Sequence, residues 1–434
     1  MKDSYHIITI GCQMNKADSE RIAAFLSSAG YKEQKGWIGA KLVVLTTCGI
    51  RQSAEDRVYG LVNHIRQNNP SAKIVITGCL AKRQDVMRRL KGKVDLFLPI
   101  NELPLLLEKL AGKEDVQGLE KAREMAGEKY LLIEPEYESA FSAYLPIGNG
   151  CNNFCSYCVV PYARGREVYR PATHILAEAK SLVERGYREI ILIAQNVNSY
   201  KSGCTDFPLL LQKLVKIKGD FWIRFSSSHP KDLSPELIKT LGTSDKICHH
   251  LHVAVQSGDD AVLKAMNRQY TAARFKELIA AIRKAKPGIA VTTDAIVGFP
   301  GETLAQFKNT ARLFREMDFD MAYTAQFSPR PGTAAWKMKD NVSRDEKKRR
   351  ERVLNAILAK SGKKINKTYL GKKIRVLTEG KNSKGKYYGK SSTFKTVVFK
   401  AEGIRPEEII GSFVKVGIGK INDFGLEGKY EGKD

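Results

Sequence analysis

The stretch GCNNFCSYC at residues 150–158 places three cysteines close together and supplies no fourth. A structural zinc site takes four protein ligands, whereas three protein ligands leave one coordination position for another molecule. The spacing C-x3-C-x2-C differs from the paired C-x2-C knuckles of zinc sites and from the ferredoxin run. It fits a [4Fe-4S] cluster with one open iron, and zinc completed by a distant residue is the alternative. Three ligands therefore indicate a catalytic site.

The region around this stretch, from about residue 141 to 340, alternates between apolar β-rich segments and helical patterns. This alternation predicts a complete or partial (β/α) barrel, whose active site lies at the carboxyl end of the strands. The three cysteines follow the first predicted strand and are therefore placed at that end. The predicted strands are SAYLPIG (142–148), EIILIAQ (189–195), FWIRFSS (221–227), HHLHVAVQ (249–256), IAVTTDAIVGF (289–299) and MAYTAQFS (321–328).

The N-terminal 110 residues predict an open parallel α/β sheet, because three apolar strand segments alternate with helical patterns. Each strand segment is followed directly by a cysteine, and the carboxyl ends of parallel strands share one sheet edge. The three cysteines are therefore expected to converge, and three buried small apolar residues are the alternative. These strand–cysteine pairs are YHIITI (5–10) with Cys12, KLVVLTT (41–47) with Cys48 and AKIVITG (72–78) with Cys79.

The first helical pattern, residues 16–30, is expected to begin near Asp18 or Ser19 as N-cap and to end at Gly30. Between the N-terminal sheet and the barrel, the polar segment 112–140 is typical of a linker. After the barrel, residues 343–367 predict a strongly basic helix.

From about residue 368 the chain predicts several short strands and hence a small β-barrel. Lysines and tyrosines alternate in this part in a pattern typical of RNA binding. They are Lys381, Lys384, Lys386, Lys390, Tyr387 and Tyr388.

The charge of the chain indicates a polyanionic partner. Its 434 residues include 72 Lys and Arg against 47 Asp and Glu, a net charge of +25. Nucleic acid is the first candidate partner and an anionic membrane surface is the second, and a soluble basic protein without such a partner is the alternative. No apolar run is long enough to span a membrane and no signal peptide is present, so a cytoplasmic protein is expected. Cys204 and Cys248, outside these motifs, are expected to be structural or incidental.

The motif Cys151-x3-Cys155-x2-Cys158, with Tyr157 before its last cysteine, resembles the signature of the radical S-adenosylmethionine enzymes. The resemblance implies a [4Fe-4S] cluster whose open iron binds the amino and carboxylate groups of S-adenosylmethionine. An electron from the cluster then cleaves the sulfonium to give a 5′-deoxyadenosyl radical. In this family S-adenosylmethionine thus occupies the coordination position that a fourth cysteine would otherwise fill.

The resemblance extends over nearly the whole chain to the methylthiotransferases, a family with three domains in this order. It implies an N-terminal domain (1–115), a linker (116–138), a radical domain (139–366) and a C-terminal RNA-binding TRAM barrel (367–434). It also implies a second [4Fe-4S] cluster on Cys12, Cys48 and Cys79. The matching blocks are GCQMNKADSE (11–20), CVVPYARGRE (158–167), AQNVNSY (194–200), VQSGDDAVLKAMNRQYT (255–271), IVGFPGET (296–303) and SPRPGTAA (328–335).

Three branches of this family differ in substrate: isopentenyladenosine in tRNA, threonylcarbamoyladenosine in tRNA, or an aspartate of a ribosomal protein. The Gln-Met-Asn after Cys12 and the segment 195–198 (QNVN) resemble the MiaB branch, which acts on isopentenyladenosine next to the anticodon. The other two branches are the alternatives within the family, and a non-catalytic zinc-bearing RNA-binding protein is the alternative outside it. Tyr169 and Ala254 depart from the family pattern, which usually has Ser and Pro there.

The resemblance also implies partners and cofactor contacts. Its partners are the tRNA anticodon loop, a reducing electron donor and a sulfur source, with no membrane. Arg164 and Arg166 are expected to meet tRNA phosphates or the cofactor carboxylate, or to lie on the surface. Beyond the cluster ligands no catalytic residue is assigned, and the cofactor contacts that the resemblance implies are Tyr157, Gln195 and Asn196. Ser226, Gln256 and Asp294 are polar residues at or near strand ends; they are further candidates for the cofactor pocket, and hydrogen-bonded structural residues are the alternative.

Overall fold

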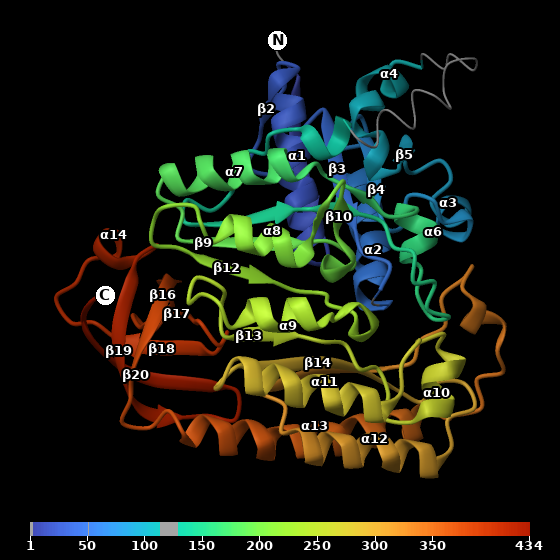
Figure 1. The fold of residues 1–434 in the computed structure, drawn as a ribbon. Coiled ribbons are helices and arrows are strands. Elements are labelled where there is room, and N and C mark those ends of the chain that lie inside the picture. The colour runs from blue at the N-terminus through green and yellow to red at the C-terminus, as the bar shows by residue number, and fades with distance from the viewer. Residues whose placement is uncertain (1–2, 51, 113–128) are drawn as a thin grey trace.

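The computed structural model describes residues 3–50, 52–112 and 129–434, and most of the predicted linker 116–138 lies outside these residues. Figure 1 shows an α/β molecule in three parts, with the C-terminal β-barrel at one end of the central strands and the helices α6 (Val160–Arg164) and α10 (Asp260–Ala265) at the other. This arrangement confirms the predicted fold class. No helix in the described residues is long and apolar enough to cross a membrane.

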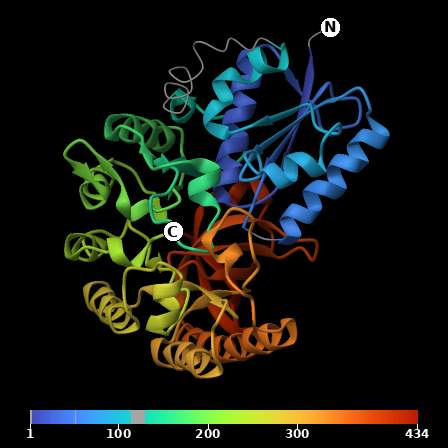
Figure 2. The same ribbon diagram turned by 90° about the vertical axis from the view of Figure 1, so that its right-hand side faces the viewer.

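The N-terminal part is an open, fully parallel sheet with strand order β2-β1-β3-β4-β5. Buried aliphatic residues fill its central strands, and helices cover both faces. Figure 2 shows this part beside the central strands. Its elements are β1 (Ser4–Thr9), α1 (Gln13–Ser28), β2 (Lys32–Glu33), β3 (Leu42–Thr47), α2 (Gln52–Asn68), β4 (Lys73–Gly78), α3 (Gln84–Arg89), β5 (Leu96–Leu98), η1 (Ile100–Leu105) and α4 (Leu106–Leu110).

The start of α1 corrects one expectation. The helix begins at Gln13 with Cys12 as its N-cap, not at Asp18 or Ser19, and Asp18 is completely buried inside the helix. Asp18 has a partner in another domain, which outweighs its usual preference for a helix start. Gly30 follows the last turn with φ +86°, as expected for a residue that ends a helix.

The central part contains six parallel strands that alternate with helices. Two three-stranded sheets, β6-β9-β12 and β13-β14-β15, are linked by isolated parallel bridges such as Ile223 to Ile247. The strands are β6 (Ser142–Pro146), β9 (Glu189–Ile193), β12 (Trp222–Phe225), β13 (His250–His252), β14 (Ala290–Val297) and β15 (Met321–Gln326). No pairing joins β6 to β15 among the described residues, so the predicted barrel is partial.

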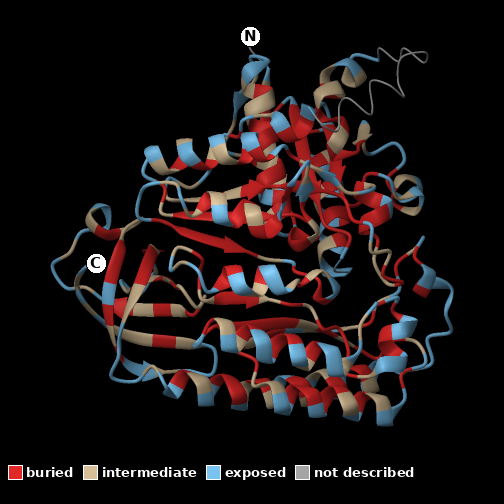
Figure 3. Ribbon diagram, in the orientation of Figure 1, coloured by how far each residue is buried: buried red, intermediate tan, exposed pale blue. Residues whose placement is uncertain are grey.

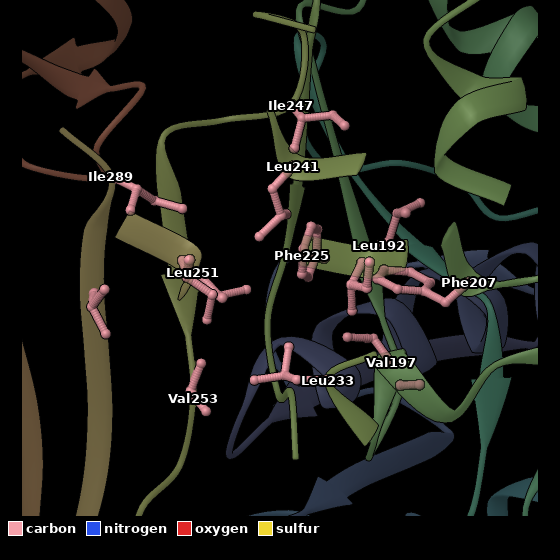
Figure 4. Close-up of a cluster of buried hydrophobic side chains, with 14 of the residues drawn as sticks. Leu192, Val197, Phe207, Phe225, Leu233, Leu241, Ile247, Leu251, Val253 and Ile289 are labelled. Atoms are coloured by element: carbon pink, nitrogen blue, oxygen red, sulfur yellow. The ribbon is translucent and has the colours of Figure 1, made fainter. Parts of the chain in front are cut away.

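The outer face of these strands carries the main core. Leu192, Phe225 and Leu251, from three neighbouring strands, contact apolar residues of the surrounding helices (Figure 4). The strands β9, β12 and β14 are almost entirely buried, whereas β15 has exposed positions and the helices expose their outer faces (Figure 3). The main helices are α7 (Ala172–Glu184), α8 (Phe207–Leu214), α9 (Pro235–Leu241), α10 (Asp260–Ala265), α11 (Ala272–Ala285) and α12 (Leu304–Met317).

The inner face of the first strands is covered by α1 of the N-terminal part. Met14 and Ala17 pack against Ile191 and Ile193, beside Tyr144. The N-terminal part therefore closes one side of the partial barrel, and the start of α1, with Cys12, lies at the carboxyl end of the barrel strands.

The C-terminal part is a closed barrel with strand order β16-β17-β18-β20-β19. Its strands are β16 (Lys373–Lys381), β17 (Tyr387–Ser391), β18 (Thr396–Lys400), β19 (Phe413–Ile421) and β20 (Gly425–Lys433), with the short helix α14 (Pro406–Ile409). The predicted basic helix is present as α13 (Arg344–Lys367), capped by the Ser343 hydroxyl. The predicted barrel is thus confirmed, although sequence patterns did not reveal β17 and β20.

Candidate active site

The loop with Cys151, Cys155 and Cys158 runs from β7 (Gly148–Asn149) to α6 (Val160–Arg164) at the carboxyl end of the barrel. The Cys151 N–H donates to the Gly165 carbonyl at 3.1 Å, which holds the two ends of the loop together. Phe154 has φ +46°, an unfavourable backbone conformation that tertiary contacts must maintain.

The end of α10 supports the tip of this loop. The Ser156 N–H donates to the Met266 carbonyl at 3.0 Å, and Asn267 Nδ2 donates to the Phe154 carbonyl at 3.0 Å. Arg268 Nη1 lies 3.5 Å from Cys155 Sγ. The loop is therefore fixed by the barrel, with a guanidinium beside one of its sulfurs.

These three cysteines have the chemistry of iron–sulfur ligands. Cys151 and Cys155 are buried and Cys158 is half-buried, and burial raises the pKa of the Cys151 and Cys158 thiols. Bound iron favours the thiolate, and donors such as Asn153 Nδ2, 3.5 Å from Cys151 Sγ, stabilise it. The donor set thus fits a cluster, and the ligand assignment remains a prediction.

The N-terminal cysteines follow β1, β3 and β4 at one edge of the sheet, where Cys12 is exposed and Cys48 and Cys79 are buried. Gly11 has no side chain and lies against Cys48, because a Cβ at this position would lie 2.8 Å from Cys48 Cβ. A Cβ on Gly49 would lie 3.2 Å from Cys79 Cβ. The segments that carry the three cysteines are therefore in close contact.

The two groups of cysteines also adjoin each other. A Cβ on Gly49 would lie 3.3 Å from a methyl carbon of Val159, the residue after Cys158. Among the described residues, no three His, Cys, Asp or Glu side chains are close enough to bind a single metal ion. In a [4Fe-4S] cluster each thiolate binds a different iron, so its ligands lie farther apart than those of one ion. The segments that follow Cys48 and Cys158 are therefore in contact, and the second cluster remains a prediction.

Four buried polar atoms without a hydrogen-bond partner lie just beyond β9 and β12. They are Gln195 Oε1, Asn196 Oδ1, Ser228 Oγ and His229 Nε2. Buried polar atoms are normally satisfied, so such a concentration indicates a polar ligand. Gln195 and Asn196 were expected to contact the cofactor, whereas Ser228 and His229 were not identified from the sequence. The sequence feature that could have indicated Ser228 and His229 is the polar stretch SSSHP after the third barrel strand.

The histidine of this group has a defined protonation state. Burial, together with the charges of Arg268 and Lys231, lowers the pKa of His229 to about 2, so its ring is neutral. Its Nδ1 accepts the Lys231 N–H at 3.2 Å, and the proton must therefore lie on Nε2. This buried Nε2–H suits a carboxylate of a bound ligand. The unpartnered atoms thus fit the amino-acid end of S-adenosylmethionine.

The other expected cofactor contacts lie at the same end of the barrel. Gln256 has φ +65° and its N–H donates to the Asp294 carbonyl at 2.8 Å, while the Asp294 carboxylate lies 3.2 Å from His252 Nε2. The Ser226 hydroxyl donates to Gln13 Oε1 at 3.1 Å and thus faces the N-terminal part. Their roles remain predictions.

Tyr157 and the two departures from the family pattern have identifiable surroundings. Tyr157 is half-buried and packs near Phe299 and Phe327. The Tyr169 hydroxyl donates to Ser199 Oγ at 2.8 Å, and the Ala254 carbonyl accepts from Arg268 Nη2 at 2.6 Å. Both departures are therefore accommodated by hydrogen bonds next to the cysteine loop.

The structure corrects the expectation for Arg164 and, in the C-terminal lysine–tyrosine set, the expectation for Tyr387. Arg164 does not face a ligand or solvent, because it is buried in an ion pair with Asp18. Tyr387 is a core residue of the C-terminal barrel, where it is 1% exposed and stacks on Phe399. Lys390 is half-buried and donates to Thr396 Oγ1 at 2.7 Å. Arg166, by contrast, is exposed.

A hollow of about 420 Å³ lies on the C-terminal barrel. Lys386 contributes to its lining, so this residue of the expected RNA-binding set lines a concave basic surface. The other lysines of the hollow are Lys400, Lys420 and Lys429, beside Glu427 and Glu431.

Three family profiles match the chain in the order of its three parts. The profile described as "Uncharacterized protein family UPF0004" matches residues 4–99, the radical SAM superfamily matches residues 145–314, and the TRAM domain matches residues 367–430.

Curated relatives match nearly the whole chain. Proteins named tRNA-2-methylthio-N(6)-dimethylallyladenosine synthase are 38% identical in Clostridium botulinum (strain Langeland) and 39% identical in Thermodesulfovibrio yellowstonii. Both matches cover 98% of this chain, with 96% and 97% of the relatives' lengths respectively.

Solved structures share the fold at low sequence identity. The radical S-adenosylmethionine methyltransferase TsrM from Kitasatospora setae, with cobalamin and a [4Fe-4S] cluster bound, superposes with a TM-score of 0.58 at 15% identity. The match covers 77% of each chain. The cobalamin-dependent enzyme OxsB gives a TM-score of 0.52 at 10% identity over 84% of this chain and 56% of that one.

Proposed function

Because this chain belongs to the family of the tRNA-2-methylthio-N(6)-dimethylallyladenosine synthases, we propose that it methylthiolates N6-isopentenyladenosine next to the anticodon of tRNA, at position 37. The observation that supports the proposal is the close approach of Gly49, the residue after Cys48, to Val159, the residue after Cys158. One cysteine group serves S-adenosylmethionine cleavage and the other serves sulfur transfer.

The substitution of a C–H bond at C2 of adenine explains why both groups are needed. This bond is not activated for acid–base chemistry, and the bound cofactors supply a 5′-deoxyadenosyl radical and a methylated sulfur for it. Cys151, Cys155 and Cys158 would hold the cluster that binds S-adenosylmethionine, and Cys12, Cys48 and Cys79 would hold the second. The protein orients the reactants and keeps the radical away from water.

The residues around the first cysteine loop would orient S-adenosylmethionine. Gln195 and Asn196 offer buried acceptor oxygens for its ammonium group, and His229 offers a donor for its carboxylate. Tyr157, Ser226, Gln256 and Asp294 remain further candidates at the same end of the barrel. The target base must be unstacked to reach this site, which suits an anticodon-loop nucleotide.

The proposed reaction requires partners beyond the chain. An electron donor must reduce the first cluster, and a sulfur source must restore the second after each transfer. The reaction would take place in the cytoplasm, with the TRAM barrel and the basic surface binding tRNA. The sister substrates, threonylcarbamoyladenosine and a ribosomal-protein aspartate, are the alternatives that product analysis distinguishes.

Cysteine substitutions test the division of labour between the two groups. Replacing Cys151, Cys155 or Cys158 with Ala should abolish formation of 5′-deoxyadenosine, measured by chromatography after anaerobic reconstitution. Replacing Cys12, Cys48 or Cys79 should spare S-adenosylmethionine cleavage but abolish methylthio transfer. Replacing Cys248, which is buried against Trp222 away from both groups, is the matched control and should change neither.

Two outcomes would contradict the assignment. Persistent 5′-deoxyadenosine formation without the first group would exclude it as the radical site, and methylthio transfer without the second would exclude it as the sulfur site. The colour of anaerobically purified protein tests the zinc alternative, because iron–sulfur protein is brown and zinc protein is colourless.

A further inference from the structure

A buried ion pair joins the two cysteine-bearing segments. Arg164 Nη2 lies 2.6 Å from Asp18 Oδ2, and the two side chains are 2% and 0% exposed. Asp18 lies on α1, six residues after Cys12, and Arg164 ends α6, six residues after Cys158. The pair therefore links the helix that starts at one cysteine group to the helix that follows the other.

Further hydrogen bonds connect this ion pair to the residues that precede the cysteine loop. Arg164 Nη1 donates to Asn149 Oδ1 at 3.0 Å, so the guanidinium contacts the residue two positions before Cys151. The Tyr130 hydroxyl, which is also fully buried, donates to the second oxygen of Asp18. We call Asp18, Arg164, Asn149 and Tyr130 the interdomain latch.

Stability alone does not account for a latch built from charges. Taking two charges out of water offsets most of their mutual attraction, and apolar residues of similar volume would often stabilise the contact at least as well. What an ion pair with directional hydrogen bonds adds is one defined geometry, since both partners are satisfied only in one relative position. The latch thus specifies how the N-terminal part is placed on the cysteine loop.

A second contact joins the barrel to the N-terminal part close to Cys48. Arg330, from the loop after β15, is buried and donates to the Ile50 carbonyl at 2.9 Å and to Gln52 Oε1 at 2.8 Å. Glu55 accepts from Arg330 and is also bonded to Arg83 at 2.6 Å. This network holds the segment that follows Cys48.

We propose that Asp18 and Arg164 are positioning residues that set the spacing between the two cysteine groups, so that each radical is formed where the sulfur can be transferred. The inference rests on the proposed function, because it assigns a cluster to each group. Neither residue is expected to touch a reacting atom. Loss of the latch should therefore uncouple cofactor cleavage from methylthio transfer while both clusters remain bound.

The test uses the double variant Asp18→Asn with Arg164→Met in the full-length, cluster-loaded protein. This change removes both charges together, so no unpaired charge is left buried, and the amide oxygen still accepts from Tyr130. The matched control is Glu189→Gln with Arg224→Met. This control pair is similarly buried, with Arg224 Nε and Glu189 Oε1 2.8 Å apart, and Glu189 is the first residue of β9.

Two readouts separate positioning from a loss of structure. The first is the amount of 5′-deoxyadenosine formed per methylthiolated product, which should rise about tenfold in the latch variant, since small displacements of reacting groups reduce rates strongly. The second is the magnetic interaction between the two reduced clusters in the electron paramagnetic resonance spectrum, which should change. The control should leave both readouts at the wild-type value.

An unchanged product ratio with an unchanged magnetic interaction would overturn the proposal, as would equal changes in the control. If the double variant does not retain its clusters, the variant Asp18→Glu replaces it in the same two measurements. Asp18→Glu keeps the negative charge and moves the carboxylate by the length of one methylene group. If wild-type protein formed no methylthiolated product, the proposed function would fail, while the magnetic interaction would still decide whether the latch sets the spacing.

Discussion

Gly150, which precedes the first cysteine of the radical loop, gives the most specific prediction for a single residue. Its φ is +86°, and a Cβ at this position would lie 2.1 Å from the Arg166 carbonyl oxygen. Gly150→Ala therefore combines two penalties. The left-handed backbone disfavours any L-residue by about 1–2 kcal/mol, and the overlap with backbone adds about 1–3 kcal/mol, as in other overpacked sites.

The size of the displacement follows from the same contact. Real Cβ atoms essentially never approach another heavy atom closer than 3.0 Å, so the loop must open by 3.0 − 2.1 = 0.9 Å. This movement separates the strands β7 and β8 (Val168–Tyr169) and strains the bond from the Cys151 N–H to the Gly165 carbonyl. A shift of about 1 Å at a reacting group reduces the rate on the order of a hundredfold.

Gly30→Ala is the matched control, because Gly30 has the same φ of +86° and open space around its missing Cβ. The assay measures iron per chain after anaerobic reconstitution and the rate of 5′-deoxyadenosine formation. Gly30→Ala should lower the free energy of unfolding only by the backbone penalty and should form 5′-deoxyadenosine at the wild-type rate. Gly150→Ala should form it about a hundredfold more slowly. Equal rates and iron contents in the two variants would show that the close contact at Gly150 does not control the cysteine loop.

Three further predictions concern charge and cofactor binding. Burial raises the pKa of Glu20 to about 7, so the stability that its protonated form contributes is fully present below pH 4.5 and is lost as the pH rises to 7. Between pH 5 and pH 8, the free energy of unfolding measured in urea should fall by about 3 kcal/mol more in the wild type than in Glu20→Gln. A difference between the two proteins that does not depend on pH would contradict this. Lys400→Ala or Lys420→Ala in the C-terminal hollow should each reduce the salt dependence of tRNA binding by about 0.7 in log–log slope; an unchanged slope would exclude that lysine from phosphate contact. His229→Phe removes the unpartnered donor and should weaken S-adenosylmethionine binding about tenfold in calorimetry, and unchanged affinity would exclude His229 from the cofactor pocket.

The fold could be predicted well from the sequence because its strands have strong local signals. Apolar β-rich runs that alternate with helices identified the strands of the N-terminal sheet that precede the cysteines and all six strands of the barrel. The strands β17 and β20 were missed, since Gly, Lys and Glu interrupt their apolar residues. Their pairing depends on barrel closure, which is a property of the tertiary fold rather than of either segment.

The candidate site was predictable only where spacing itself carries the chemistry. Closely spaced or strand-end cysteines reveal a ligand set, but the partner of a charged side chain lies far away in the sequence. Asp18 therefore resembled a helix cap and Arg164 resembled an anion contact, although 146 positions apart they form one buried pair. His229 was missed for a similar reason, because its unpartnered Nε2 is apparent only once the folded chain buries it.

Methylthiolation of isopentenyladenosine in tRNA is the activity that we propose for this chain. The most direct measurement is nucleoside mass spectrometry of tRNA from a host that lacks its own methylthiotransferase, with and without this chain expressed. The nucleoside 2-methylthio-N6-isopentenyladenosine should appear only when the chain is expressed and should disappear again with Cys151→Ala. Methylthiolated threonylcarbamoyladenosine in place of this nucleoside, or no methylthiolated tRNA from protein that carries its clusters and cleaves S-adenosylmethionine, would contradict it.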